Sequence, residues 1–212
     1  VEFPDFPRAG QTVRRLEAAG IDPSAVTDVV LTHLHMDHVG GLEGLFQRLW
    51  FDEACRGRTR LYVHAALMPL LQSRVADYPG VLAEGGVNFW EAFRLLPCSR
   101  GFWHAGYWFE VFATRHHRPG TSFGLALPGS FAWTGDTRPI PEMLDVHAGG
   151  RELVAHDCGL VGNPSHTGIE DIAREYPGAL QRQLLLYHYG SAADGEALAA
   201  RGFRVVAPGQ RI

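Results

Sequence analysis

Thr32-His33-Leu34-His35-Met36-Asp37-His38 is the stretch that decides the fold of this 212-residue chain. The apolar run 29–31 precedes it and a Gly-Gly pair at 40–41 follows it, so we expect a buried strand to lead in and a helix to lead out. Side chains alternate along a strand, which predicts that His33 and His35 leave it on one face. Imidazole nitrogen and carboxylate oxygen are ligands of zinc, manganese and iron. The stretch therefore predicts a metal site.

His-x-His-x-Asp-His followed by Gly-Gly resembles the signature of the metallo-β-lactamase-fold hydrolases. The resemblance implies an α/β protein built as a four-layer αββα sandwich, with one or two metal ions at the edge between the sheets. The family usually places a strand pair before this motif. Residues 1–7 contain two prolines, which remove sheet donors, so we expect either missing N-terminal edge strands or a shortened sequence.

The composition predicts one soluble, cytoplasmic domain over residues 1–212. The chain is 46% hydrophobic and contains no apolar run of the ~20 residues that a membrane span needs. Its net charge is −4 and its 19 basic residues are all arginine and scattered, which does not support a nucleic-acid partner. Cys55, Cys98 and Cys158 lie far apart, as reduced thiols would.

Hydrophobic periodicity predicts alternating helices and strands, which is typical of α/β layers. We expect helices at 11–19, 41–53, 65–75, 141–147, 169–176 and 194–201. We expect strands at 26–32, 60–64, 108–114, 122–127, 130–133, 151–155, 183–187 and 203–207. The aromatic-rich stretch 88–112 is interpreted as mostly core, with one or two side chains at a pocket rim; a substrate wall or a dimer contact is the alternative.

The pair His116-His117 ends the predicted strand 108–114. The resemblance implies a single histidine here that completes a three-histidine metal site. Adjacent side chains on a strand point to opposite faces, so only one of the two is expected to bind metal. We favour His116, because Arg-Pro-Gly after His117 has the composition of a turn, and His117 remains the alternative.

Two further motifs resemble family ligands. Gly135-Asp136-Thr137 is similar to the segment that carries the carboxylate bridging two metals, and His188 ends the apolar strand 183–187. A bridging carboxylate offsets the repulsion between two dications. The resemblance thus implies two sets of ligands, one of His33, His35 and His116, the other of Asp37, His38, Asp136 and His188.

The segment around His156-Asp157 and the later Ser165-His166-Thr167 are similar to motifs of the ribonuclease Z and phosphodiesterase branch, with Asp157 in place of the family's Glu. The resemblance implies that His166 protonates the leaving oxygen, which makes Asp37 and His166 the expected catalytic residues. His156 is interpreted either as orienting a ligand or as a buried structural histidine. Three arginines flank the presumed site and are either phosphate partners or surface charges: Arg115, Arg118 and Arg138.

These motifs together predict a hydrolase with two divalent ions, zinc first, with manganese or iron also suited to the ligands. The resemblance implies cleavage of a phosphodiester by metal-bound hydroxide. A small substrate, cyclic or nucleotide, is favoured because the basic arm of the tRNA-processing enzymes is absent. A thioester or lactone hydrolase of the glyoxalase II type and a non-catalytic metal-binding protein are the alternatives. The resemblance alone implies a homodimer.

Overall fold

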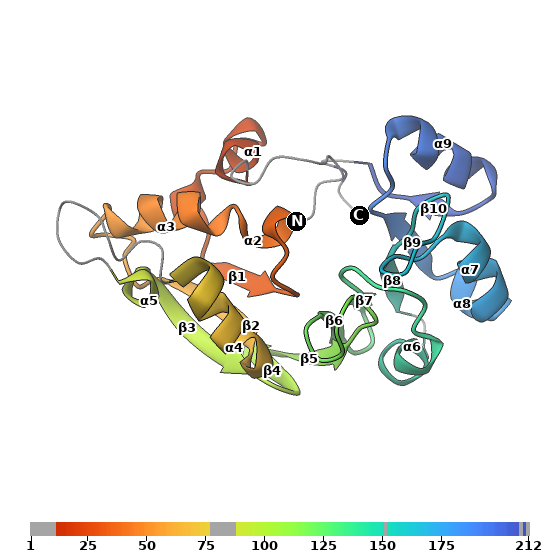
Figure 1. The fold of residues 1–212 in the computed structure, drawn as a ribbon, viewed down its shortest axis with the longest axis horizontal. Coiled ribbons are helices and arrows are strands. Elements are labelled where there is room, and N and C mark those ends of the chain that lie inside the picture. Colours follow the sequence, from red (N-terminus) through yellow and green to blue (C-terminus); the bar gives the residue numbers. More distant parts are fainter. Residues whose placement is uncertain (1–11, 77–87, 151, 208–209, 211–212) are drawn as a thin grey trace. The chain divides into compact units, whose positions relative to one another are not determined.

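The computed structural model describes residues 12–76, 88–150, 152–207 and 210. Within these residues the chain forms two compact units, the N-terminal unit ending at Cys98 and the C-terminal unit beginning at Ser99. Each unit has its own sheet and its own helices (Figure 1). The single domain over residues 1–212 stays a prediction. The expectation about edge strands from residues 1–7 lies outside the described residues.

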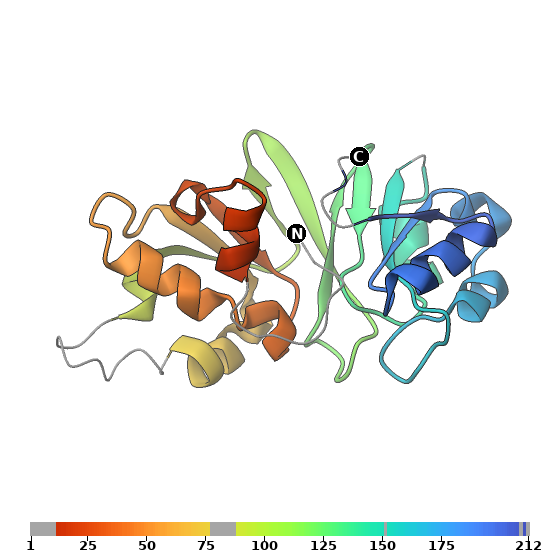
Figure 2. The ribbon, with the colours of Figure 1, turned by 90° about the horizontal axis from the view of Figure 1, so that it is seen from above.

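The N-terminal unit contains a three-stranded parallel sheet in the order β1 (Asp28–Leu31), β2 (Thr59–His64), β3 (Phe93–Cys98). Parallel neighbours need crossover connections, and α3 (Leu42–Trp50) supplies the first of them. Its apolar face, which includes Phe46, is buried, and Figure 2 shows α3 (orange) alongside the sheet. The other elements of this unit are α1 (Thr12–Ala18), η1 (Pro23–Ala25), α2 (Met36–Val39), η2 (Ala65–Leu67), α4 (Met68–Leu71), η3 (Gln72–Ala76) and α5 (Phe89–Ala92).

The C-terminal unit contains a seven-stranded sheet whose strand directions bring four chain segments to one edge. Its order is β10 (Arg204–Val205), β9 (Leu184–Tyr187), β8 (Leu153–Asp157), β7 (Phe131–Trp133), β6 (Phe123–Leu127), β5 (Tyr107–Ala113), β4 (Gly101–His104). β7 to β10 pair in parallel, and β4 to β7 pair antiparallel. β5, β7, β8 and β9 therefore all run in one direction. Their carboxyl ends meet at the same edge of the sheet.

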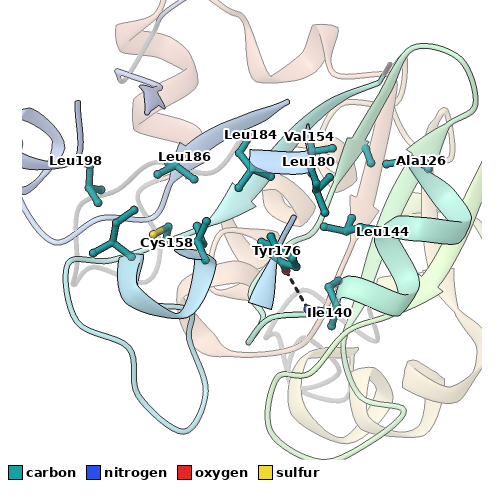
Figure 3. Close-up of a cluster of buried hydrophobic side chains, with 14 of the residues drawn as sticks. Ala126, Ile140, Leu144, Val154, Cys158, Tyr176, Leu180, Leu184, Leu186 and Leu198 are labelled. Atoms are coloured by element: carbon teal, nitrogen blue, oxygen red, sulfur yellow. Dashed lines mark hydrogen bonds between the residues drawn. The ribbon is translucent and has the colours of Figure 1, made fainter. Parts of the chain in front are cut away.

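A leucine-rich core holds this sheet to its helices. Side chains from α6 (Pro141–His147), α7 (Ile169–Glu175), α8 (Gly178–Gln181) and α9 (Ala192–Ala200) meet the strands in one buried cluster (Figure 3). Leu144, Leu184 and Leu198 are among its fully buried members. Each such side chain contributes about 1.5–3 kcal/mol by leaving water. The core fixes the strands whose ends carry the polar residues described below.

Most predicted elements are confirmed, with boundaries shifted by a few residues, and three expectations are corrected. The predicted helix 65–75 consists of η2, α4 and η3, and the last predicted strand, 203–207, shortens to β10. Most of the aromatic side chains in 88–112 are not core: Phe89, Phe93 and Phe112 are buried, but Trp103 and Tyr107 are 67% and 62% exposed on the β4–β5 hairpin. None of the described helices has the length and hydrophobicity needed to cross a membrane.

Candidate metal centre

The histidine motif of the N-terminal unit lies between β1 and α2. β1 ends at Leu31, one residue before the predicted end of the strand, so His33 and His35 follow the strand in an extended turn. The turn still gathers the rings: the centroids of His33 and His35 are 4.7 Å apart, and those of His33 and His38 are 3.9 Å apart. Three imidazoles therefore cluster at this point as predicted.

Asp37 completes this cluster from the first turn of α2. Its Oδ2 lies 3.4 Å from Nε2 of His38. The interaction with His38 is the main cause that lowers the pKa of Asp37 to about 2, so the side chain is a carboxylate at neutral pH. The backbone of the motif is also held, because the guanidinium of Arg74 donates to the carbonyl of Leu34 at 3.2 Å.

The second set of polar residues lies at the common edge of the seven-stranded sheet. His116 follows β5, Asp136 follows β7, Asp157 ends β8 and His188 follows β9. Hydrogen bonds join the ends of strands that lie two positions apart in the sheet: Thr114, after β5, donates to the carbonyl of Asp136, after β7, at 3.2 Å, and the hydroxyl of Tyr187, in β9, donates to the carbonyl of Gly135 at 2.7 Å. The strand directions thus bring His116 and His188, which are 72 residues apart in the sequence, to the same edge of the sheet.

The carboxylate of Asp136 lies between two imidazoles at a spacing that suits metal ligation. Its Oδ2 is 3.7 Å from Nε2 of His116 and 3.8 Å from Nε2 of His188, beyond hydrogen-bond length. Two ligands of one tetrahedral zinc ion, each about 2.0–2.2 Å from it, lie about 3.3–3.6 Å apart. Burial lowers the pKa of His116, which favours the neutral form that binds metal. These residues fit a divalent metal ion.

Asp157 is a buried carboxylate that accepts three hydrogen bonds. Its Oδ2 accepts from Nδ1 of His166 at 2.8 Å and from the backbone N–H of Thr137 at 2.9 Å, and its Oδ1 accepts from Nδ1 of His188 at 3.0 Å. Burial acts to raise the pKa of Asp157. The hydrogen bonds from His166 and His188 outweigh that effect and leave the pKa below its usual value.

His166 is carried by a tightly closed loop over residues 159–168. Gly159 and Gly168 pair at its base, and a Cβ added to Gly168 would lie 2.1 Å from the backbone nitrogen of Gly162. The side chain of Asn163 accepts from the backbone N–H of His166 at 3.0 Å. The centroid of His166 lies 4.8 Å from that of His116 and 4.9 Å from that of His188. The loop therefore holds a third imidazole beside the ligand candidates.

The two histidines of the pair His116-His117 differ in their surroundings. His116 is 2% exposed and faces Asp136, whereas His117 is exposed and has a φ of 56°, because the chain turns there. Nδ1 of His116 donates to the carbonyl of Ser165 at 2.9 Å, so its Nε2 is the nitrogen directed at Asp136.

Hydrogen bonds define the roles of His156 and Arg115. His156 is fully buried: its Nδ1 donates to the carbonyl of Asp157 at 2.7 Å, and its Nε2 accepts from the hydroxyl of Tyr176 at 2.6 Å, so it is a structural histidine. The guanidinium of Arg115 donates to the carbonyl of Pro139 and to Glu142, both at 2.8 Å. Arg115 is thus bound to the start of α6.

The sequence motif around His156 included Asp157 without assigning it a role, and nothing in the sequence indicated the contact made by the carbonyl of Ser165. Asp157 ends an apolar strand at the ligand edge, and that position was a usable signal for its role. The carbonyl of Ser165 carried no signal, because its contact with His116 depends on the path of the loop.

Comparison with known proteins gives relatives over nearly the whole chain. The sequence profile of the family described as Anti-Pycsar protein Apyc1 matches residues 9–212. The chain is 27% identical over 184 residues to the Anti-Pycsar protein Apyc1 of Paenibacillus xerothermodurans, covering 83% of this chain and 72% of the relative. It is 35% identical over 179 residues to a ribonuclease of Thermus thermophilus, covering 78% of this chain and 39% of that protein.

Solved structures agree on the fold. A diphosphatase from the PhnP family matches with a TM-score of 0.70 at 16% identity, over 95% of this chain and 75% of that one. The metallo-β-lactamase fold protein YhfI from Bacillus subtilis matches with a TM-score of 0.65 at 13% identity, over 93% and 82%. The predicted fold and the ribonuclease-like branch are thereby confirmed. With the metallo-β-lactamase fold and a profile match from residue 9 to the last residue, this chain belongs to the Anti-Pycsar protein Apyc1 family.

Proposed function

We propose that this chain is a metal-dependent phosphodiesterase that hydrolyses a small phosphodiester, with cyclic nucleotides as the substrate class. One observation carries the proposal. In the C-terminal unit, His166 donates through Nδ1 to Asp157, which leaves Nε2 to act beside the pair formed by His116 and Asp136. A carboxylate flanked by imidazole ligands, with a separate imidazole held next to it, suits the cleavage of a phosphoester.

We assign seven side chains to two divalent metal ions, with zinc as the first choice. His33, His35 and His116 would hold the first ion; Asp37, His38 and His188 would hold the second; and Asp136 would be a ligand shared by both. Support within each unit comes from the clusters described above. The assignment across the two units rests on the order of the motifs along the chain and on membership of the family. A homodimer and a cytoplasmic location remain part of the proposal.

The chemistry divides between the metals and the chain. When bound, a pair of divalent ions lowers the pKa of a water molecule and polarises the phosphoryl oxygens. Asp37 stays ionised, so it can accept a hydrogen bond from the attacking water. His166 would deliver a proton to the leaving oxygen from Nε2, and the carboxylate of Asp157, which accepts from Nδ1, orients the ring for this transfer.

Charge favours a small substrate over an extended nucleic acid. The chain has a net charge of −4, and contacts with a phosphate backbone need clustered cations. The guanidinium of Arg115 is bound to Pro139 and Glu142, so it is a poor candidate for a phosphate partner. Arg138 is the better candidate, because it is exposed two residues after Asp136 and lines an open groove with Leu160.

The test combines metal analysis with a substrate panel of bis(p-nitrophenyl) phosphate, 3′,5′-cyclic nucleotides, S-acyl glutathione and a lactone. We expect two metal ions per chain and turnover of the phosphodiesters. Turnover of only the thioester or the lactone would replace the proposal. Fewer than one metal per chain with no hydrolysis would support a non-catalytic protein.

The matched variants are His166→Ala and Asp145→Asn. His166→Ala is expected to lower turnover of cyclic nucleotides by about 10²–10⁴-fold without loss of metal, the range for a removed general acid. Asp145→Asn removes the charge of an exposed side chain on α6 and should change turnover by no more than about twofold. Equal activity of the two variants would reject His166 as the acid.

A further inference from the structure

The tip of the loop that carries His166 is a tight turn closed by one side chain. Asn163-Pro164-Ser165-His166 has the composition of a β-turn, because Asn is favoured at its first position and Pro presets φ at its second. The backbone N–H of Asn163 donates to the carbonyl of His166 at 3.0 Å, and the N–H of His166 donates to the carbonyl of Asn163 at 3.4 Å. Oδ1 of Asn163 also accepts from the N–H groups of Ser165 at 2.8 Å and of His166 at 3.0 Å. The side chain of Asn163 therefore fixes the backbone of both residues.

This turn presents two groups to the ends of the strands. The carbonyl of Ser165 accepts from Nδ1 of His116 at 2.9 Å. The imidazole of the next residue, His166, has its centroid 4.8 Å from that of His116. One short stretch of backbone thus carries the acceptor that orients a ligand candidate and the imidazole proposed as the acid. A shift of this stretch moves both groups at once.

We propose that Asn163 is a positioning residue, which holds the backbone at 165–166 and through it the orientation of His116 and the place of His166. The inference rests on the proposed function for the tasks of the two histidines. The hydrogen bonds on which it depends are independent of those tasks. Asn163 is exposed, and its Oδ1 contacts the backbone of the turn and not a ring.

The turn depends on these internal hydrogen bonds because the other contacts of the loop lie at its base. There the N–H of Gly159 donates to the carbonyl of Thr167 at 2.9 Å, and the hydroxyl of Thr167 donates to the carbonyl of Thr137 at 2.7 Å. The tip is open on one side: Asn163 lines a groove together with Val161, which is 84% exposed. The base fixes where the loop ends, and the side chain at position 163 fixes how its tip is folded.

The test is a graded series at position 163. Asn163→Asp keeps the accepting oxygen, Asn163→Ser offers a weaker acceptor and Asn163→Ala offers none, so turnover should fall in that order. For cyclic nucleotides, whose leaving group is an alkoxide that needs a proton, Asn163→Ala should lower turnover by about 10–100-fold, the cost of a misplaced catalytic group. Turnover of bis(p-nitrophenyl) phosphate should fall much less, because p-nitrophenolate leaves without a proton. A merely structural role would lower both rates alike.

The link to His116 has a readout of its own. Asn163→Ala should bind Zn²⁺ about 10-fold more weakly in a chelator competition, at the lower end of the effect of losing the partner of a metal ligand. In a His166→Ala background, Asn163→Ala should change turnover little further and still weaken Zn²⁺ binding. Asn88→Ala is the matched control, because Oδ1 of Asn88 also accepts from a backbone N–H, that of Trp90 at 3.1 Å, at the start of α5 in the N-terminal unit. It should change neither the leaving-group dependence nor the Zn²⁺ affinity.

Amide hydrogen exchange in the metal-free protein tests the geometry without any activity. In the unmodified protein, the N–H groups of Ser165 and His166 should exchange more slowly than that of Val161. They should exchange faster in Asn163→Ala and at the original rate in Asn163→Asp. Equal exchange of the three amides in the unmodified protein would overturn the proposal.

A folded Asn163→Ala variant that keeps either its leaving-group dependence or its Zn²⁺ affinity would also overturn it. If the chain hydrolyses no ester, the proposed function fails, while Zn²⁺ affinity and amide exchange still decide the role of Asn163.

Discussion

Removing the hydroxyl of Tyr176 should destabilise the C-terminal unit without touching the candidate ligands. Tyr176 is 3% exposed, and its hydroxyl has two partners: it accepts from the backbone N–H of Ile140 at 2.9 Å (Figure 3) and donates to Nε2 of His156 at 2.6 Å. Burial raises the pKa of Tyr176, so the hydroxyl stays protonated and remains a donor. The substitution Tyr176→Phe leaves both partners buried.

The expected magnitude follows from those two partners. Ile140 and His156 are each 0% exposed, and a buried polar group without a partner costs about 1–3 kcal/mol. Allowing for partial relaxation, we expect Tyr176→Phe to lower the free energy of unfolding by about 2–5 kcal/mol. For a chain of this size, about 2–4 °C of Tm is lost per kcal/mol, so the Tm should fall by roughly 5–15 °C.

Urea denaturation and a thermal scan measure both quantities. Tyr107→Phe is the matched control, because its side chain is 62% exposed and a surface change of this kind stays within about ±0.5 kcal/mol. A loss of less than about 1 kcal/mol for Tyr176→Phe would refute the reasoning, because it would mean that the unpaired groups find other partners. Metal content should be equal in the two variants.

Three further predictions concern the loop, alkaline stability and metal removal. Gly168→Ala places a Cβ 2.1 Å from the backbone of Gly162, at a φ of −101° that any residue can adopt, so the loop must move, and we expect a loss of about 1–3 kcal/mol in stability and lower turnover through His166. Gly178→Ala is the control and should be neutral, because the nearest atom to its Cβ lies at 3.7 Å. Equal kinetics for the two variants would contradict the steric argument. Burial raises the pKa of Cys158 from 9.0 to about 12, so the folded state holds a proton that the unfolded state releases. The free energy of unfolding should therefore fall as pH rises from 9.0 toward about 12. In urea titrations, Cys158→Ala should make this dependence of the free energy on pH weaker. Chelation should abolish hydrolysis and lower the Tm, since a ligand at 100 times its Kd adds about 2.7 kcal/mol; an unchanged Tm would argue against tightly bound metal.

The parts of the site that the sequence predicts are those that sit at strand ends. Asp136 and His188 each follow an apolar run, and parallel strands bring their carboxyl ends to one edge, so pattern alone brings these residues together. At His33 the alternation of side chains along a strand no longer applies, because β1 ends at Leu31, and the extended turn that follows brings the rings together. The aromatic stretch misled for a related reason: composition alone does not distinguish a buried strand from the exposed β4–β5 hairpin that carries Trp103.

The groups that the sequence could not predict are those that fix orientation. An imidazole can present either nitrogen, and the choice depends on what the other nitrogen contacts. In the C-terminal unit the carbonyl of Ser165 makes that choice for His116, and Asp157 makes it for His166 and His188. The contacts of His116 with Ser165 and of Asp157 with His166 depend on the path of the loop over residues 159–168, which carries no periodic pattern. Because a protein oxygen accepts from Nδ1 of His116, His166 and His188, Nε2 is the nitrogen that each of these rings presents to the site.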